Sequence, residues 1–180
     1  MAAVLNAAAD RGIRFRVIYA EDSHAPKPKS HATDVVGELR RRDVPVAVVP
    51  FAALATALPA TTFALVGAES VVENGGVISS MGTYQMGLLM RSVGKPFYVV
   101  AESHKFVRVY PLNGEDLPTG QGALEFSTDD RGVGKGEHEE GKRKDDEVDF
   151  TPPELIAAIV TEAGVQTPSA VSEELIKIWY

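Results

Sequence analysis

The sequence has no cysteine among its 180 residues. Disulfide bonds, thiolate zinc sites and a cysteine nucleophile are therefore excluded from this chain. The lack of disulfides fits a reducing compartment. Residues 1–9 are short for a signal peptide and have no basic start, so we expect a protein of the cytosol.

Positive charge is also scarce, with 18 Lys and Arg against 25 Asp and Glu and a net charge of -7. A nucleic-acid-binding protein usually presents a basic face to the phosphates, so we expect no direct nucleic-acid contact. Long apolar runs are missing too, so no segment is expected to span a bilayer and no membrane partner is expected.

Apolar residues are nonetheless plentiful, at 44% of the chain, enough for the core of one domain over residues 1–180. Four apolar runs are typical of strands, and they alternate with amphipathic segments typical of helices. This pattern predicts an α/β fold with a mostly parallel sheet and helices on both faces. The strands are expected at 15–19, 44–49, 63–66 and 97–100, and the helices at 2–10, 30–42, 51–58 and from Ile78 to Gly94.

Residues 114–149 break this pattern, because they hold few large apolar groups and a dense run of mixed charge. Such a segment buries too little surface to offset its ordering entropy, so we expect a flexible charged loop, with a partner-binding tail as the alternative. A helix at 151–164 should follow, with Thr151 as its N-cap, Pro152 in its first turn and an apolar stripe of Leu155, Ile156 and Ile159.

A last helix is expected at 167–180, with Val171, Leu175, Ile176 and Trp179 facing inward. The helix at 2–10 opens without an N-cap residue, which suggests that the natural chain extends upstream. Arg40, Arg41 and Arg42 are interpreted as a solvated helix end, favoured by the helix dipole.

A ligand site is predicted where the third strand ends, because ligands of open α/β sheets bind outside the carboxyl ends of the strands. Glu69 lies just past this end, a tight turn follows, and the backbone N–H groups at the start of the next helix, over 74–78, could hold an anion. The candidate ligand-binding residues are Glu69, Asn74, Gly75, Gly76, Ser79 and Ser80. Structural roles compete with this interpretation: a helix cap for Glu69, a turn or an N-cap for Asn74, and a position in solvent or at the helix start for Ser79 and Ser80.

A subunit interface is predicted from two further stretches. Residues 105–108 alternate charged and apolar side chains, as an edge strand does, and two large aromatic residues end the chain as either a core plug or an interface anchor. The candidate interface residues are Lys105, Phe106, Arg108, Trp179 and Tyr180. His24 and His104 lack the spacing of metal ligands, so no metal site is expected.

Segments 71–78, 82–86, 95–108, 111–113 and 167–177 resemble the alpha subunits of eukaryotic translation initiation factor 2B. The resemblance implies a Rossmann-like C-terminal domain of a longer protein, similar to the beta and delta subunits. It also implies a homodimer that joins the beta, gamma, delta and epsilon subunits into a guanine-nucleotide exchange factor for initiation factor 2. In that family the alpha subunit is regulatory and helps to sense the phosphorylated alpha subunit of initiation factor 2, so no catalytic residue and no cofactor are expected.

The same fold includes sugar-phosphate isomerases that act on methylthioribose 1-phosphate or ribose 1,5-bisphosphate. These isomerases use a cysteine and the aspartate of a Gly-Ala-Asp motif, which here reads Gly67-Ala68-Glu69. The family's cysteine would fall upstream of Met1, its Asn-Lys pair is replaced by Ser79-Ser80, and a phosphate-contacting arginine is replaced near Ser23-His24. The resemblance therefore implies a non-catalytic cleft that holds a sugar phosphate or a nucleotide, with an active isomerase as the alternative.

Overall fold

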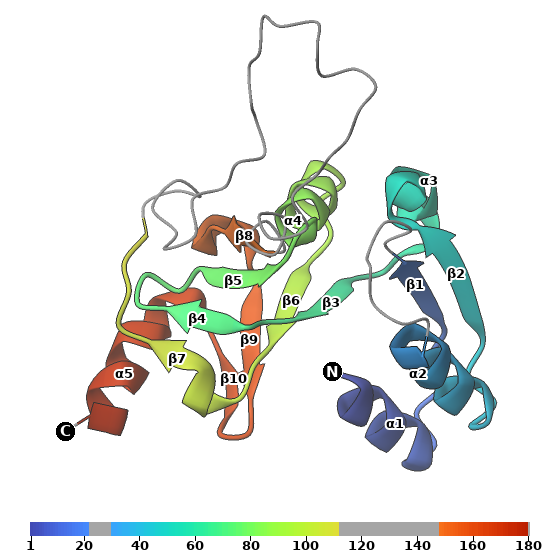
Figure 1. Ribbon diagram of the computed structural model, residues 1–180, viewed down its shortest axis with the longest axis horizontal. Helices are drawn as coiled ribbons and strands as arrows, with labels where there is room; N and C mark the ends of the chain where they lie inside the picture. The colour runs from blue at the N-terminus through green and yellow to red at the C-terminus, as the bar shows by residue number, and fades with distance from the viewer. Residues whose placement is uncertain (22–29, 112–147, 180) are drawn as a thin grey trace, which may run out of the picture.

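The computed structural model describes residues 1–21, 30–111 and 148–179 (Figure 1). The helices are α1 (Ala2–Asp10), α2 (Ser30–Arg40), α3 (Leu54–Ala57), α4 (Thr83–Ser92) and α5 (Val171–Trp179), and short 3-10 turns flank several of them. The strands of the first half are β1 (Val17–Glu21), β2 (Val46–Pro50), β3 (Ala64–Gly67), β4 (Ser70–Val72) and β5 (Val77–Ser80). Those of the second half are β6 (Phe97–Val100), β7 (Phe106–Val107), β8 (Val148–Thr151), β9 (Ala158–Thr161) and β10 (Gly164–Gln166).

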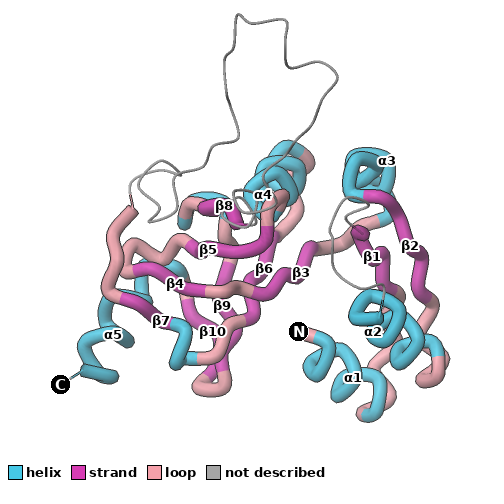
Figure 2. The backbone as a smooth tube through the Cα atoms, in the orientation of Figure 1, coloured by secondary structure: helices cyan, strands magenta, loops and turns pink. Residues whose placement is uncertain are grey.

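The strands form three sheets in the described ranges, with orders β1-β2, β10-β9-β6-β3 and β7-β4-β5-β8 (Figure 2). The pairs β1/β2, β3/β6, β6/β9 and β4/β7 are parallel, and the other pairs are antiparallel. The predicted α/β class with mostly parallel pairing is therefore confirmed. The prediction of a single sheet is wrong, because β1 and β2 pair only with each other and a second small sheet follows β3.

The core lies on one face of the β10-β9-β6-β3 sheet. Alternate residues of each strand point to this face. Val66 of β3 lies opposite Val99 of β6, which lies opposite Ile159 of β9. These side chains pack with Met90 of α4 and Leu175 of α5, all nearly free of solvent contact. One contiguous core therefore joins the middle of the chain to its C-terminal part.

Residues 77–80 are strand β5, which corrects the prediction of a helix from Ile78 to Gly94. The turn that follows β4 sends the chain back as an antiparallel hairpin, with Ser70 opposite Ile78 and Val71 opposite Val77. The helix begins only at Thr83, after Gly82 in the left-handed conformation. β-branched residues at 77 and 78 fit a strand better than a helix.

The helix predicted at 151–164 is also wrong, because β8, a 3-10 turn (Pro153–Leu155), β9 and the start of β10 occupy this range. Leu155, Ile156 and Ile159 are buried as expected, but on strand and turn backbone. Thr151 caps no helix and instead pairs with Val77 inside a sheet.

The remaining elements lie close to their predicted positions, with ends shifted by one to four residues, and α1 and β6 have the predicted bounds. Val171 and Leu175 of α5 are buried as predicted, whereas Ile176 is 55% exposed. Val148 and Asp149, which the prediction placed in the charged loop, belong to β8, and residues 114–147 lie outside the described residues. Within the described ranges, no helix has the length and apolar character needed to cross a membrane.

Candidate functional site

The carboxyl end of β3 is held by two side chains that come from distant parts of the chain. The Ser79 hydroxyl donates a 2.8 Å hydrogen bond to the Gly67 carbonyl, and the Lys105 ammonium donates a 2.8 Å hydrogen bond to the Ala68 carbonyl. The structure therefore brings Ser79 and Lys105 to the sheet edge where a ligand was expected. Ser79 is buried in β5, which corrects the interpretation of this residue as facing solvent or the helix start.

Glu69 follows directly and is exposed. Its backbone N–H donates to the Ile78 carbonyl at 2.9 Å, which anchors the backbone at the base of the β4–β5 hairpin. Ser80 is also exposed, and its carbonyl accepts a 2.6 Å hydrogen bond from the Thr83 hydroxyl. Glu69 and Ser80 are thus accessible to solvent, and the partly buried ammonium of Lys105 lies beside the end of β3.

Asp149 is a residue of this region that the sequence analysis missed. It is 6% exposed, and its Oδ2 accepts hydrogen bonds from the N–H groups of Gly82 at 2.7 Å and Tyr84 at 3.0 Å, at the start of α4. Burial raises the pKa of the Asp149 carboxyl, although the backbone N–H groups of Tyr84, Gly82 and Thr83 act in the opposite direction. The alternation of polar and apolar residues over 148–151 was the available signal, but the charged segment before it concealed the strand.

The position of Asp149 decides how an anion can bind. The N-terminus of an α-helix attracts anions, because its backbone N–H groups lack helical partners and the positive end of the helix dipole lies there. At α4, the Asp149 carboxylate already accepts hydrogen bonds from N–H groups at this end. A phosphate at this edge could instead be held by the ammonium of Lys105. The predicted anion site on a helix start over 74–78 is wrong, because no helix begins there.

Asn74, Gly75 and Gly76 form the tip of the hairpin, whereas Glu69, Ser79 and Ser80 lie at its base. Asn74 donates from Nδ2 to the Pro111 carbonyl at 2.9 Å and accepts at Oδ1 from the Gly76 N–H at 2.8 Å. The structure therefore separates the predicted ligand set into two groups. Asn74 shows the turn role that competed with ligand binding.

Close packing explains the two glycines of the tip. A Cβ on Gly75 would lie 2.2 Å from the Pro168 carbonyl oxygen, and Gly75 has a φ of +84°. A Cβ on Gly76 would lie 2.5 Å from the Phe150 ring. The glycines thus let the hairpin tip contact both the C-terminal segment and β8.

The neighbouring strand ends are acidic. The Ser103 backbone N–H and hydroxyl both donate to the exposed Glu162 carboxylate, and the Ser103 hydroxyl is the main cause that lowers the pKa of Glu162. The Nε2 atom of His104 lies 3.5 Å from Oε2 of Glu102, and both side chains are exposed. No group of three or more His, Asp or Glu side chains suitable for a metal ion occurs in the described ranges.

The predicted interface residues have different environments. β7 is the edge strand of its sheet, as expected, but Phe106 is a buried core residue, so its side chain is not available to a partner. Lys105 is partly buried and holds β3, and Arg108 is exposed. Trp179 ends α5, while Tyr180 lies outside the described residues.

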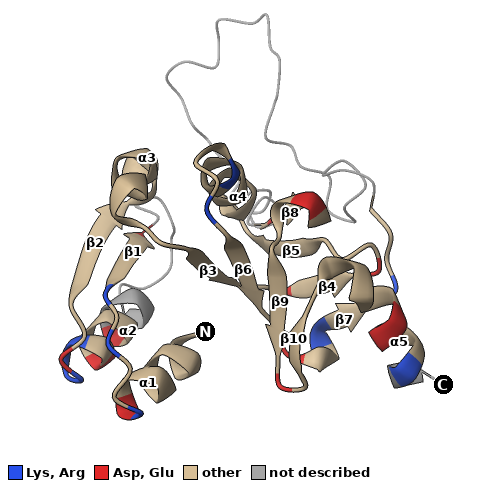
Figure 3. Ribbon diagram, turned by 180° about the vertical axis from the view of Figure 1, so that it is seen from behind, with Lys and Arg blue, Asp and Glu red and all other residues tan. Residues whose placement is uncertain are grey.

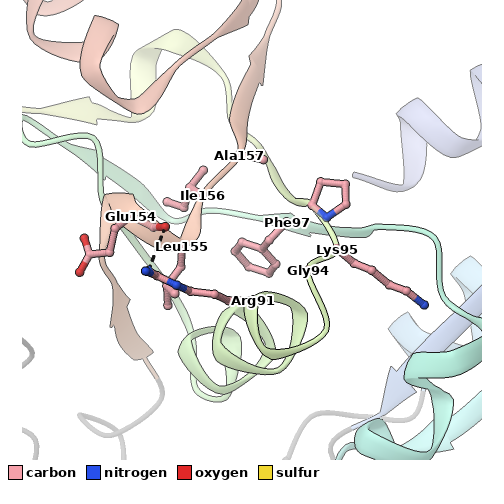
Figure 4. Close-up of a pocket in the computed structure, with 9 residues that line it drawn as sticks. Arg91, Gly94, Lys95, Phe97, Glu154, Leu155, Ile156 and Ala157 are labelled. Atoms are coloured by element: carbon pink, nitrogen blue, oxygen red, sulfur yellow. Dashed lines mark hydrogen bonds between the residues drawn. The ribbon is translucent and has the colours of Figure 1, made fainter.

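A pocket of about 370 Å³ lies at the opposite end of the sheet, where β6 begins (Figure 4). Arg91 reaches across its rim and donates to the Glu154 carbonyl at 3.3 Å, while the Lys95 side chain extends away from it and donates to the Leu58 carbonyl at 2.6 Å. None of the residues predicted to bind a ligand lines this pocket.

Comparison with known proteins identifies relatives of this chain. Residues 1–168 match the Initiation factor 2 subunit family. The chain is 38% identical to translation initiation factor eIF2B subunit alpha of Dictyostelium discoideum over 175 residues, which cover 96% of this chain and 53% of that protein. It is 35% identical to methylthioribose-1-phosphate isomerase of Pseudomonas fluorescens over 164 residues, which cover 90% of this chain and 44% of the isomerase.

A solved structure shares the fold. In the tetrameric eIF2B beta2-delta2 complex of C. thermophilum, a chain superposes with a TM-score of 0.70 at 20% identity, covering 99% of this chain and 51% of that chain. The chain thus spans about half the length of the relatives that it matches.

Proposed function

This chain belongs to the Initiation factor 2 subunit family, and we propose that it is part of the regulatory alpha subunit of the translation initiation factor 2B complex. The observation that carries the proposal is the 38% identity to an eIF2B alpha subunit over 96% of the chain. The whole complex would act as the guanine-nucleotide exchange factor for initiation factor 2, with this subunit contributing assembly and regulation.

We propose that the inherited cleft is not catalytic. The carboxylate after Gly67-Ala68 belongs to a glutamate, one methylene longer than the aspartate expected of an isomerase, and misplacing a reacting group by about 1 Å can cost on the order of a hundredfold in rate. Asp149, a second carboxylate of this region, is buried and accepts hydrogen bonds from the start of α4, so it is not free to replace that aspartate.

The same cleft would serve as a binding site for a sugar phosphate or a nucleotide. Glu69 and Ser80 offer an exposed carboxylate and an exposed hydroxyl, which suit the hydroxyl groups of a sugar. Lys105 supplies a positive charge at the same strand end. Such a ligand would act as a structural or regulatory signal.

The proposed partners are a second copy of the protein, the beta, gamma, delta and epsilon subunits, and initiation factor 2 with its phosphorylated alpha subunit. Exposed apolar side chains on and beside α4 favour subunit contacts, because such groups gain free energy when a partner covers them. They are Met81, Tyr84 and Leu88. The cytosolic location expected from the sequence stays a prediction.

An exchange assay tests the proposal. The whole protein is added to a complex of the beta, gamma, delta and epsilon subunits, and nucleotide release from initiation factor 2 is followed with and without phosphorylation of its alpha subunit. We expect the added protein to increase the inhibition of exchange caused by the phosphorylated factor. An unchanged exchange rate under both conditions would contradict the regulatory role.

An aldose–ketose isomerase is the second candidate, favoured by the 35% identity to methylthioribose-1-phosphate isomerase. Incubation of the whole protein with methylthioribose 1-phosphate distinguishes the two functions. The regulatory proposal predicts no turnover above background, whereas turnover lost on Glu69→Ala substitution would establish the isomerase.

A further inference from the structure

Six arginines gather at one end of the molecule, at the beginning of β1 and β2 and the end of α1 and α2. Residues 10–16 and 40–43 hold these six arginines and two aspartates, a net charge of +4 in a chain whose total is -7, so the other residues together carry -11. In Figure 3 several blue segments lie at this end, with red ones among them, and other blue segments lie on α4, β7 and α5. The arginine surface consists of Arg11, Arg14, Arg16, Arg40, Arg41 and Arg42.

Contacts between the elements hold this surface together. Arg42 of the segment after α2 forms a 2.9 Å ion pair with Asp10 at the end of α1. Arg40 donates to the Val46 carbonyl at 3.1 Å, and the Val17 N–H donates to the Pro45 carbonyl at 2.9 Å, so the ends of both helices meet the starts of both strands. Two stretches far apart in sequence therefore form one positively charged surface.

Four of these side chains have no partner among the described residues. Arg11, Arg14, Arg16 and Arg41 are exposed, and their guanidinium groups form no hydrogen bond or ion pair within residues 1–21, 30–111 and 148–179. Like charges held close together repel one another, which costs folding free energy unless an external partner supplies negative charge. The helix dipole explains a basic end of α2, but it does not explain Arg14 and Arg16, which precede β1.

Exposed apolar side chains occur in the same part of the chain as the arginines. Ile13 is 58% exposed and lies in sequence between Arg11 and Arg14, and Val48 of β2 is exposed as well. Arginine beside exposed aliphatic side chains is typical of protein–protein interfaces, where arginine is enriched. Nucleic-acid binding usually adds exposed aromatic rings for base stacking, but Phe15, the aromatic residue within the arginine stretch, is half-buried. The -11 charge elsewhere would also repel a long polyanion.

We propose that the arginine surface docks an acidic segment of another polypeptide, one in which apolar residues are interspersed among glutamates or aspartates. The carboxylates would pair with the free guanidinium groups, and an apolar side chain would cover Ile13. The opposite charge would speed the encounter and make binding depend on salt. This surface lies at the N-terminal ends of β1 and β2 and goes beyond the proposed role in exchange.

Fluorescence anisotropy tests the proposal with a labelled peptide of about twenty residues, made of glutamate with a few leucines, as the ionic strength is raised. The patch variant is R14Q/R41Q, and the matched control is R91Q/K177Q, which removes the same charge from exposed residues elsewhere. We expect the patch variant to weaken binding about threefold to tenfold at low ionic strength, as two exposed ion pairs allow, and the control to change it less than twofold. Thermal unfolding of each variant checks that the fold is kept.

Equal losses in the two variants would overturn the proposal, because binding would then follow the net charge rather than this surface. Absence of peptide binding by the unmodified protein would overturn it as well. A third contradicting result is a single-stranded oligonucleotide of equal charge that binds more tightly than the peptide and loses affinity in R14Q/R41Q, since the surface would then recognise nucleic acid.

Discussion

Glu69 and Asp149, two carboxylates near the end of β3, differ in environment, and the difference separates their roles. Glu69 is exposed at the sheet edge, whereas Asp149 is buried and holds the start of α4. The position of Glu69 could be predicted from the sequence, because an apolar run that ends at glycine marks a strand end. Asp149 could not, because its role depends on a hydrogen bond to a residue 67 positions away.

Glu69→Ala should weaken the binding of a sugar phosphate or a nucleotide while leaving the fold intact. Glu69 is exposed, so its loss removes a hydrogen-bond acceptor from the cleft without opening a cavity in the core. Isothermal titration calorimetry with fructose 6-phosphate and adenosine monophosphate measures the effect. Glu73→Ala, an exposed glutamate at the hairpin tip, is the control and should bind as the unmodified protein does. Unchanged affinity in Glu69→Ala would refute the role of this carboxylate.

Asp149→Asn and Asp149→Ala should differ in stability. Asparagine keeps an oxygen that can accept the N–H groups of Gly82 and Tyr84, whereas alanine leaves both unsatisfied, at a cost of about 1 to 3 kcal/mol for each buried group. Chemical denaturation of the two variants measures the difference. An equal loss of stability in Asp149→Asn and Asp149→Ala would show that these hydrogen bonds do not stabilise the start of α4.

The pH dependence of stability gives a separate test of Asp149. Burial raises the pKa of this carboxyl in the folded state above its unfolded value, so the folded state binds the proton more readily than the unfolded chain. The contribution of Asp149 to stability is therefore largest below the unfolded pKa and declines as pH rises through the folded pKa. We expect the free energy of unfolding of the unmodified protein to rise relative to that of Asp149→Asn when the pH is lowered through this window. A constant difference between the two proteins would contradict the raised pKa.

Among the elements, the β4–β5 hairpin shows where local sequence patterns are informative and where they are not. The turn at Asn74-Gly75-Gly76 was predicted correctly, because consecutive glycines favour a tight turn. The strand after it was interpreted as helix, since the apolar residues from Ile78 to Met90 have nearly helical spacing. The pairing of β5 with β4 and β8 decided its conformation, and long-range pairing leaves little trace in local spacing.

The helix prediction for the region from β8 to β10 was wrong for a related reason. Thr151-Pro152 is typical of a helix start, and the spacing of Leu155, Ile156 and Ile159 fits one face of a helix. A short buried strand is equally apolar and cannot be distinguished from a buried helix by periodicity alone. Parallel pairing with β6, with Val99 opposite Ile159, outweighs the local preference.

Gly75→Ala should destabilise the protein through the contact of the hairpin tip with the C-terminal segment. The added Cβ would lie 2.2 Å from the Pro168 oxygen, at a residue with positive φ. Crowding and the left-handed conformation together should lower the free energy of unfolding by about 3 kcal/mol. Gly37→Ala in α2 is the control, because its Cβ meets nothing within 4 Å, and it should stabilise by about 0.5 to 1 kcal/mol. Thermal or chemical unfolding compares the two, and equal stability would contradict the contact.

At the scale of the whole molecule, we propose an assembly subunit whose isomerase-like strand end lacks the isomerase aspartate. The family membership, the exposed apolar residues around α4 and the glutamate at the strand end are consistent with this view. The sequence was sufficient to predict the fold class and the relatives, because several long motifs occur in the correct order. It was not sufficient to predict the separate β1–β2 pair, which depends on which strand edges meet.

The most direct test of the central claim is the native mass of the complex formed when the whole protein is mixed with the beta, gamma, delta and epsilon subunits. The account predicts a decamer that contains two copies of every subunit, joined through a dimer of this one. A protein that stays a single molecule, with the other subunits at the same mass as in its absence, would contradict the account.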